Sequence, residues 1–497
     1  RETTVNKSVK TIVIAGGGTA GWTAAAAIAK QMGPTVNITL VESDEVGTVG
    51  VGEATIPPMR VFHKLLGIDE KDFMRATSAT FKLGIQFENW GQKGDNYIHS
   101  FGVTGRESFV APFHHFWLYG KEQGVANDFG NYCFELEAAK QDKFATSQNA
   151  NIQYAYHLDS SLYATLLRNY SETRGVTRKE GKIEQITQNK ETGFIESLKL
   201  ASGDVIHGDF FIDCTGFRGL LIEEALKTGY EDWSHWLPCD SAVAVQTESD
   251  SAPRPITKAI AHDSGWQWKI PLQHRTGNGL VYCSKYLSDE HATQRLLDNI
   301  TGNTITKPRI IKFKTGRRLK AWNKNCLALG LSSGFVEPLE STSIHLIIMG
   351  IIRFLKLFPN GGVSELIADE YNRQTLEEVV KIRDFIILHY HATYRKDSPF
   401  WQYCHDMEVP DTLKHRMQLF KEFGHAFQED GELFRVDSWT QVMLGQGIMP
   451  ESYHASVKGM PAKELQRFLQ GIELSVLKGL ENMPSHETFL KHYCSSR

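Results

Sequence analysis

The chain has 497 residues, of which 41% are hydrophobic and 23% charged, a composition typical of a folded protein with a large core. Its net charge of −4 is unlike the basic surface of a general nucleic-acid binder, so we expect no nucleic-acid partner. No run approaches the roughly 18 apolar residues of a membrane span, and residues 1–10 lack the apolar core of a signal peptide. Seven cysteines without a CxxC pair indicate reduced thiols rather than disulfides or a metal site, as in a cytoplasmic protein that does not contact membranes.

The first predicted elements form a strand–turn–helix–strand unit. Residues 11–15 (TIVIA) are a short apolar run, which is typical of a buried parallel strand. A glycine turn follows at 16–21, and the alanine-rich residues 20–30 favour a helix. A second strand is predicted at 37–41 and ends at Glu42. This order of elements is typical of the start of a dinucleotide-binding fold.

Strand patterns return further along the chain, at residues 197–200, 210–213, 241–246 and 326–329. From about residue 344 the pattern becomes helical, as at 377–389 and 463–477. We therefore expect an α/β nucleotide-binding body over residues 1–345. A mostly helical, substrate-side region over 346–497 is expected to pack on it, and no Pro/Gly-rich linker marks the boundary.

The glycine turn at 16–21 (GGGTAG) matches the pattern G-x-G-x-x-G. Gly16 permits the tight turn, Gly18 lets the backbone approach a pyrophosphate, and Gly21 allows close packing of helix and strand. The free N–H groups of the helix N-terminus attract phosphate, and Glu42, 21 residues after Gly21, can accept hydrogen bonds from ribose hydroxyls. A glycine turn without a ligand is the alternative, but the strand before it and the helix after it favour a nucleotide site.

A second segment favours FAD over NAD as the nucleotide. Residues 210–217 (FFIDCTGF) are similar to the second nucleotide-contact strand of FAD-binding oxidoreductases, although a plain strand-to-loop transition has the same pattern. No second G-x-G-x-x-G motif is present for a nicotinamide nucleotide. We therefore expect a Rossmann-like fold of the flavin monooxygenase type that does not reduce its own flavin.

The string GWQWKIP at residues 265–271 is the most specific signal in the chain. Its two indoles, Trp266 and Trp268, are two residues apart and so lie on one face of a strand. By spacing alone, the two tryptophans could also be ordinary core residues. Three more segments accompany the string, and they are GVGEATIP at 50–57, TFKLG at 80–84 and FVEPLESTSI at 335–344. Together the four segments resemble the flavin-dependent halogenases, and among these the tryptophan halogenases, in the family's order.

The resemblance implies a reaction and assigns its residues. Lys82 corresponds to the family's active-site lysine, and Glu340 corresponds to its active-site glutamate. By residue type alone, Lys82 would be expected to be a surface lysine and Glu340 an acid at the start of a helix. Reduced FAD, O2 and chloride or bromide would yield hypohalous acid, with the halide held near Thr342 and Ser343. Lys82 would orient that acid through its ammonium group or become a haloamine, and Glu340 would polarise it, stabilise the cationic ring or accept its proton.

The resemblance also implies the cofactor, its contacts and its source. The tryptophan string would keep the substrate away from the flavin, and the segment at 50–57 would form a strap over the isoalloxazine ring. Further cofactor contacts are assigned to Thr19, Ala20, Ala54, Gly330, Leu331 and Ile344. A separate flavin reductase must supply the reduced FAD. The oligomeric state is left open, with a homodimer as one alternative.

The substrate is expected to be a small aromatic molecule of the indole type. His99 and Phe101 resemble the family's pair that stacks on the indole, with a half-buried strand face as the alternative. The region 427–439 is shorter than in the tryptophan halogenases and lacks their tyrosine pair, and the role of Trp439 is left open. Ser343 stands where these relatives have glycine. We therefore expect bromination or chlorination of free indole or another arene rather than of free tryptophan. A flavin-dependent aromatic hydroxylase and a non-catalytic flavin-binding redox sensor are the competing readings.

Overall fold

A computed structural model describes residues 8–45 and 52–496 and divides the chain into two compact units. Each unit is assembled from three stretches of sequence. The first comprises the described residues of 1–78, 158–234 and 313–379, and the second comprises 79–157, 235–312 and 380–497. The two units are defined by contacts between residues that are distant in the sequence. The boundary expected near residue 345 was based instead on the change from strand patterns to helical patterns along the chain.

The first unit is built on a sheet with the strand order β20-β21-β12-β1-β2-β8, in which all neighbours run parallel except β20 and β21, which are antiparallel. At its centre, β1 (Thr11–Ala15) pairs in parallel with β2 (Asn37–Glu42) and with β12 (Phe210–Asp213). These apolar strands are buried, because α1 (Gly18–Met32) packs against β1 and β2, and residues of β10 (Ile195–Leu200) and η3 (Leu220–Ala225) join the strands in one apolar cluster. The remaining strands are β8 (Thr177–Glu180), β20 (Trp322–Asn323) and β21 (Cys326–Ala328).

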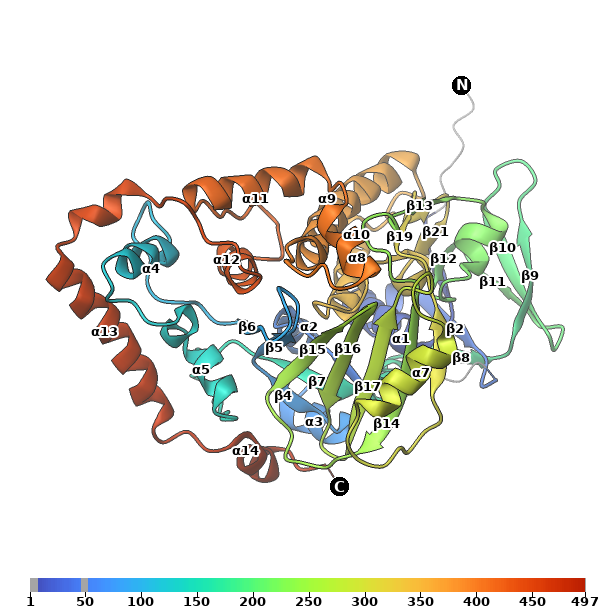
Figure 1. Cartoon of the computed structure of the whole chain (residues 1–497). Helices are drawn as coiled ribbons and strands as arrows, with labels where there is room; N and C mark the ends of the chain where they lie inside the picture. The colour runs from blue at the N-terminus through green and yellow to red at the C-terminus, as the bar shows by residue number, and fades with distance from the viewer. Residues whose placement is uncertain (1–7, 46–51, 497) are drawn as a thin grey trace. The chain divides into compact units, whose positions relative to one another are not determined.

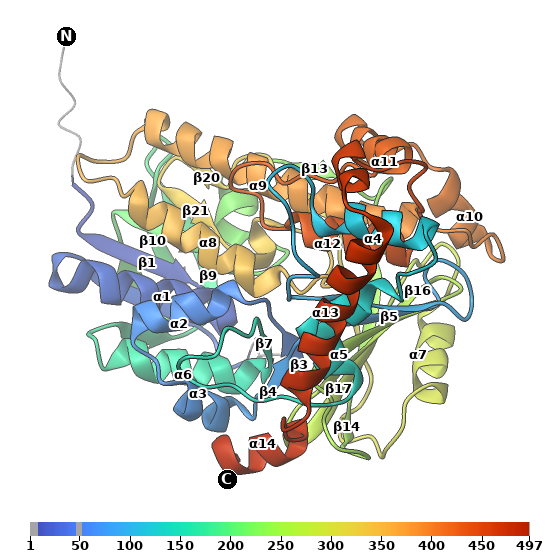
Figure 2. The same ribbon diagram turned by 90° about the vertical axis from the view of Figure 1, so that its left-hand side faces the viewer.

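The helix after the glycine turn, α1 (Gly18–Met32), makes the β1-α1-β2 crossover. Its residues Ala24–Ala27 are fully buried, and the lack of bulk there lets α1 pack closely against α6 (Ser160–Glu172) and α8 (Ser343–Lys356) (Figure 2). Other helices of the unit are η1 (Gly33–Thr35), α2 (Pro58–Leu66), α3 (Glu70–Thr77), η3 (Leu220–Ala225) and η4 (Gly330–Ser332). Its outer strands are β3 (Gly52–Ala54), β9 (Ile183–Gln188), β10 (Ile195–Leu200), β11 (Val205–His207), β13 (Tyr230–Asp232), β19 (Gly316–Arg318) and β22 (Gly334–Phe335).

The second unit is built on a seven-stranded sheet in the order β18-β14-β17-β16-β15-β5-β6 (Figure 1). All its neighbours are antiparallel except β15 and β5, which run parallel. The strands are β5 (Gly84–Glu88), β6 (Asn96–Ser100), β14 (Ser241–Glu248), β15 (Ile256–His262), β16 (Gly265–Pro271), β17 (Arg275–Tyr282) and β18 (Arg309–Lys312). Beside it, the short strand β4 (Thr80–Lys82) pairs antiparallel with β7 (Ala155–Asp159).

Helices complete the second unit. An apolar cluster forms where α13 (Ala462–Leu480) packs against α4 (Phe113–Glu122) and η2 (Phe129–Tyr132), and α13 also contacts α5 (Phe134–Lys140). The long helix α9 (Glu365–His391) begins in the first unit's last stretch and ends in the second unit's. The others are α7 (Asp289–Asp298), α10 (Pro399–Asp406), α11 (Asp411–Phe423), α12 (Val436–Gly445), η5 (Ala455–Gly459) and α14 (His486–Tyr493).

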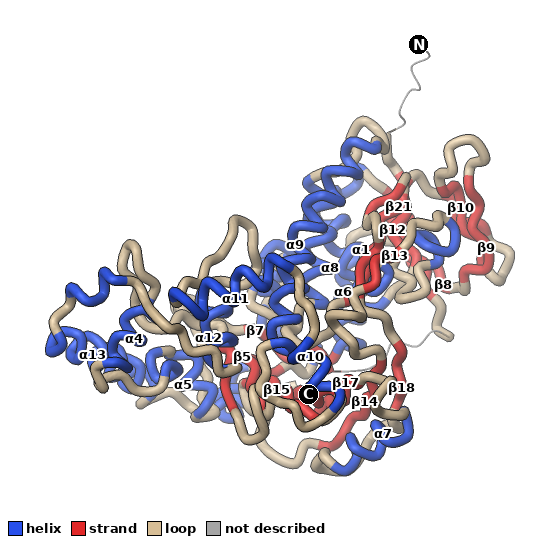
Figure 3. Tube along the Cα trace, turned by 45° about the horizontal axis from the view of Figure 1, so that its top comes forward, coloured by secondary structure: helices blue, strands red, loops and turns tan. Residues whose placement is uncertain are grey.

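The structure confirms the expected α/β class and the type of each predicted element. All the predicted strands are present, and the chain from α8 to α14 is helical, as the helices labelled α8 to α13 show (Figure 3). The helix expected at 463–477 runs over Ala462–Leu480, directly after Pro461, which sits at its N-cap. Within the described residues, no helix is both long and apolar enough to cross a membrane.

Candidate functional site

The glycine turn of the first unit leaves room for a nucleotide at the start of α1. Gly16 has a φ of +97°, and a Cβ there would collide with the carbonyl oxygen of Cys214 at 2.2 Å. Gly21 is equally constrained, since its Cβ would lie 2.1 Å from the carbonyl oxygen of Gly16. Gly18, with a φ of +65°, has no atom within 4 Å of its Cβ position. Two glycines therefore shape the turn, and the third borders open space where a phosphate can approach.

The acid at the end of β2 lies against this turn. A Cβ on Gly17 would lie 1.6 Å from Glu42 Oε2, so the Glu42 carboxylate lies directly against the turn between Gly16 and Gly18. Glu42 Oε1 accepts a hydrogen bond from Arg178 at 2.8 Å. The N-cap of α1 has no side-chain hydrogen bond, which leaves its first N–H groups available to a phosphate. These features fit a dinucleotide such as FAD.

The other cofactor positions assigned in this unit cluster only in part. Gly330 has a φ of +71°, and its Cβ position lies 3.0 Å from the Cβ of Ala20 in the first turn of α1. Thr19 and Ala54 are half-buried, Leu331 is exposed, and Ile344 is buried in the first turn of α8, a helix that packs on α1. These placements bring Gly330 and Ala20 together. The contact of each of these residues with the cofactor stays a prediction.

The acid at the end of β12, Asp213, bonds the loop that follows it. Its carboxylate is fully buried and accepts hydrogen bonds from the backbone of Thr215, Leu221 and Ile222 at 2.8–3.0 Å. The hydroxyl of Thr215 donates a fourth bond at 2.6 Å. Both oxygens are therefore occupied in holding the loop after β12, which the strand-to-loop alternative describes.

The segment that carries Glu340 has an unusual backbone. Glu337 and Ser341 have φ angles of +73° and +59°, a region in which side chains other than glycine are strained and which is common at functional sites. Glu340 is 1% exposed, and Glu337 is fully buried. Strain and burial of two acids in one short segment single it out within the first unit.

The two residues predicted to hold the halide, Thr342 and Ser343, lie where α8 begins. Thr342 is the N-cap and is fully buried, and its Oγ1 has no hydrogen-bond partner among the described residues. Ser343 is the first helical residue and has no positive φ, so its backbone does not need the glycine of the relatives. Nδ1 of His345, one residue beyond Ile344, is likewise buried without a partner in the described part of the chain. A hydroxyl at a helix N-terminus suits an anion.

The segment at 50–57 contains an acid that the sequence analysis did not single out. Gly50 and Val51 lie outside the described residues, whereas Glu53 is described in β3. Burial raises the pKa of Glu53 to about 7, and the carboxyl in turn adds to the effect of burial in raising the pKa of Tyr163. A carboxyl that exchanges its proton near neutral pH in the strap segment is a functional candidate.

In the second unit, Lys82 is fully buried at the end of β4. Its Nζ lies 5.2 Å from the centre of the Phe101 ring, a cation–π contact. The backbone N–H of Phe101 donates to the carbonyl oxygen of Leu83 at 3.0 Å, which ties the two segments together. The unit thus brings together the predicted lysine and one of the predicted substrate residues. Glu340 belongs to the first unit, so its pairing with Lys82 stays a prediction.

The two tryptophans of the 265–271 string share a face of β16, as expected. Their ring centres are 6.2 Å apart, and Trp266 is 2% exposed. Trp268 lies over Gly279 of β17, where any Cβ would enter its ring. Trp266 also packs near Trp90, at 6.4 Å between ring centres. The string therefore anchors an aromatic core of the second unit and presents the half-buried Trp268 beside it.

His99 is buried in an aromatic box. Its Nε2 lies 2.9 Å from the hydroxyl of Ser438 in α12, and its ring centre is 5.7 Å from that of Phe385. Phe385 stacks on Phe434 at 3.9 Å and contacts Trp439 at 4.9 Å. Packing among these rings leaves the half-buried Phe101 as the more accessible of the two predicted substrate residues.

In the region 427–439, both carboxylate oxygens of Glu432 accept hydrogen bonds from other protein groups. Its oxygens accept from Arg416 at 2.6 Å, from Trp439 Nε1 at 3.1 Å and from the backbone N–H of Glu429 at 2.9 Å. The guanidinium of Arg416 also lies 4.2 Å from the ring centre of Trp439. Trp439 is 1% exposed, so it is part of this buried network.

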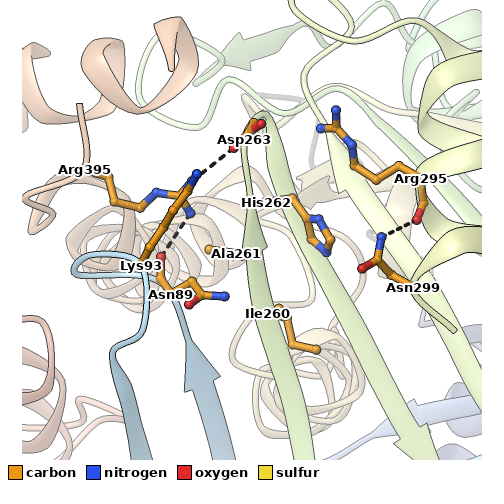
Figure 4. A pocket seen from close by; sticks show the side chains of 9 residues that line it. All are labelled: Asn89, Lys93, Ile260, Ala261, His262, Asp263, Arg295, Asn299 and Arg395. Atoms are coloured by element: carbon orange, nitrogen blue, oxygen red, sulfur yellow. Dashed lines mark hydrogen bonds and ion pairs between the residues drawn. The ribbon is translucent and has the colours of Figure 1, made fainter. Parts of the chain in front are cut away.

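A pocket of about 360 Å³ opens in the second unit at the turn between β15 and β16 (Figure 4). Its lining is polar and comprises Asn89, Lys93, Ile260, Ala261, His262, Asp263, Arg295, Asn299 and Arg395. Arg395 is 2% exposed and is held by Asp397, Asp263 and the carbonyl oxygen of Asn89. Because its walls are mostly polar and charged, this pocket does not suit a bare aromatic ring.

Comparisons with known proteins agree with these features. The family model for tryptophan halogenase matches residues 11–462. The solved structure of the flavin-dependent halogenase Xcc4156 from Xanthomonas campestris is 53% identical, with a TM-score of 0.97 and 99% of each chain covered. That of BrvH from Brevundimonas sp. BAL3 is 42% identical, with a TM-score of 0.93, and covers 98% of this chain and 99% of that one. The tryptophan 6-halogenase ThaL from Streptomyces albogriseolus is 33% identical over 90% of this chain and 91% of its own. The chain therefore belongs to the tryptophan halogenase family and is a flavin-dependent halogenase.

Proposed function

We propose that this halogenase transfers chlorine or bromine to an electron-rich arene of the indole type through Lys82. Bound at the glycine turn, the cofactor in its reduced form would convert O2, a halide ion and a proton into hypohalous acid and water. The single observation that carries the proposal is the complete burial of Lys82 beside Phe101, because a buried amine can hold a small electrophile away from bulk water.

Lys82 and Glu340 would divide the halogen transfer between them. The Lys82 ammonium donates a hydrogen bond to the oxygen of the hypohalous acid, or its amine forms a haloamine with release of water. The ring carbon forms its bond to the halogen, and the carboxylate of Glu340 accepts the ring proton that leaves. For the hydrogen-bonded route, arene and hypohalous acid give haloarene and water. The halide is held at Thr342 and Ser343, where a buried hydroxyl stands at the start of α8.

The preference for free indole over free tryptophan is supported by the region 427–439. An enzyme that clamps an amino acid needs a carboxylate for the ammonium group, and the oxygens of Glu432 are already taken by protein donors. The aromatic side chains Phe434 and Trp439 are packed into the buried network and do not form an open clamp. A bare arene needs neither group.

A panel of aromatic substrates with bromide, NADH and a separate flavin reductase tests the substrate, read by mass spectrometry. We expect bromoindole, marked by the isotope pattern of bromine, at a rate at least about tenfold above that of bromotryptophan, roughly 1.4 kcal/mol of discrimination. Efficient bromination of tryptophan with indole ignored would refute the preference. Addition of oxygen would instead indicate hydroxylation. The need for a reductase that uses cellular NADH supports a cytoplasmic site of action, and a homodimer remains one alternative for the assembly.

Replacement of Lys82 tests the mechanism. In Lys82→Ala we expect loss of halogenated product while oxidation of reduced FAD continues, because the amine acts after the halide has been oxidised. The measurement pairs product mass with flavin absorbance in the same reaction. Product formation at the wild-type rate in Lys82→Ala would remove this residue from the mechanism.

A further inference from the structure

The strand that carries Lys82 is held by a chain of hydrogen bonds, and the donor and acceptor of each bond can be assigned. The hydroxyl of Thr80, two residues before Lys82, donates its one hydrogen to the carbonyl oxygen of Pro271 at 2.6 Å. Thr80 Oγ1 also lies 2.9 Å from Nδ1 of His157. Because the hydrogen of Thr80 is used, its oxygen accepts here, and Nδ1 of His157 carries the proton.

The other ring nitrogen completes the chain. Nε2 of His157 lies 2.7 Å from Oγ1 of Thr257. A neutral imidazole carries one proton, so Nε2 accepts and Thr257 donates. The chain therefore runs from Thr257 through His157 and Thr80 to Pro271, the last residue of the tryptophan string. Every one of these groups is supplied by the second unit.

His157 is uncharged at neutral pH. It is fully buried, and burial, the charge of Lys82 and the proximity of His486 hold its pKa well below the usual value. His486, in α14, accepts from the backbone N–H of Phe81 at 3.1 Å and donates through Nδ1 to the carbonyl oxygen of Pro253 at 2.7 Å. Burial lowers its pKa to about 4. Two neutral histidines thus flank β4.

The position of His157 relates it to Lys82 directly. In the pairing of β4 with β7, Thr80 stands opposite His157, and Lys82 stands opposite Ala155. Residues two apart on a strand share a face, so Lys82 and His157 are diagonal neighbours on one face of the pair. A protonated imidazole there would place a second buried positive charge beside the ammonium group.

We propose that His157 is a positioning residue for Lys82. Its neutral imidazole, bonded at both nitrogens, fixes Thr80 and through it the backbone of β4, so that the Lys82 amine points at one place. The proposal rests on the role of Lys82 given above. It predicts a specific defect when the chain is broken, since flavin chemistry does not need the lysine. Hypohalous acid would still form but would escape before it meets the arene.

The test compares two variants of His157 in the holoenzyme with indole, bromide and a flavin reductase. His157→Gln can both donate and accept and is uncharged at every pH, whereas His157→Leu fills similar space without either bond. The measured quantities are bromoindole formed per reduced FAD oxidised, the KM for indole, and hypobromous acid captured by a soluble β-diketone. The matched control is His114→Gln, another buried histidine of the second unit, whose ring bonds the carbonyl oxygen of Gly424.

We expect His157→Leu to lower bromoindole per FAD oxidised by about 10- to 100-fold, the range that a displacement of about 1 Å at a reacting group produces. Captured hypobromous acid should rise, while flavin oxidation and the KM for indole stay unchanged. His157→Gln should stay within about threefold of the wild type because it restores both bonds, and His114→Gln should match the wild type. A purely structural histidine would instead lower thermal stability and FAD oxidation together.

Wild-type coupling in His157→Leu would overturn the proposal. So would a loss in His157→Gln as large as in His157→Leu, since the imidazole would then be a reacting group. If His157→Leu does not fold, Thr257→Val removes only the first bond of the chain, and we expect an intermediate loss that Thr257→Ser restores. An unchanged Thr257→Val would contradict the proposal. Failure of the lysine mechanism is seen separately, as product formation in Lys82→Ala.

Discussion

The glycine turn of the first unit and the Lys82 strand of the second are built by opposite means. The turn at residues 16–21 works through its backbone, with Cβ atoms missing where carbonyl groups or a phosphate must come close. The Lys82 strand works through groups from separate places along the chain, namely the side chains of Thr80, His157 and Thr257 and the backbone carbonyl of Pro271. A contiguous backbone site should fail completely when one atom is added, whereas a dispersed network should fail by degrees.

The largest effect that sharpens this comparison is expected at Gly18. In Gly18→Ala the added methyl group enters the open space beside the helix N-terminus, so we expect FAD affinity to fall by about 100-fold, measured by quenching of flavin fluorescence. Gly67→Ala is the matched control, because Gly67 follows α2 in the left-handed conformation, with a φ of +74° and an open Cβ position. Both changes should cost roughly 1–2 kcal/mol of stability, since both force a left-handed conformation on alanine. Equal FAD affinity in the two variants would contradict the account of the turn.

The same contrast explains how much could be derived from sequence. Gly16, Gly18, Gly21 and Glu42 were predictable because the strand, turn and helix that use them are neighbours along the chain. For residues 210–217 the sequence left two interpretations open, because an acid at a strand end has the same pattern whether it faces a ligand or accepts from its own loop.

The network around Lys82 could not be read from the sequence for a physical reason. Thr80 and His157 are 77 residues apart, and Thr257 lies 100 residues beyond His157, so no local pattern links them. Trp439 was left open for the same reason, since its burial depends on Arg416 and Glu432, which come from an earlier helix and loop. Family resemblance located Lys82 itself, but the surroundings that hold it come only from the fold.

A medium effect is expected at Thr342, which is predicted to hold the halide. In Thr342→Val the hydroxyl is lost with little change of size, and we expect the KM for bromide to rise about tenfold, because a hydrogen bond to an ion contributes about 1.5 kcal/mol or more. Stability should hold or increase, since Thr342 Oγ1 has no partner among the described residues. The control is Thr440→Val, a buried hydroxyl of α12 that also has no partner in the described part of the chain. An unchanged bromide KM in Thr342→Val would remove this hydroxyl from the halide site.

The last effect concerns the stability of the fold, through Glu53 and its dependence on pH. The folded carboxyl has a pKa of about 7 against 4.5 for the unperturbed group, so the native state binds the proton more tightly than the unfolded state. Its contribution to stability is therefore fully present below pH 4.5 and is lost as the pH rises towards 7. Urea unfolding of the wild type and Glu53→Gln from pH 4.5 to 8 measures this. The stability advantage of Glu53→Gln should grow across that interval, and a constant difference would show that Glu53 titrates normally.

A crystal structure of the enzyme with FAD and bromide tests the central claim most directly, through the distance between Lys82 Nζ and the nearest carboxylate oxygen of Glu340. Halogen transfer through this pair predicts that the amine and the carboxylate lie within about 6 Å of each other in one chamber closed to bulk water. A separation well beyond that distance, or a Lys82 amine that faces solvent, would contradict the mechanism and leave the role of both residues unexplained.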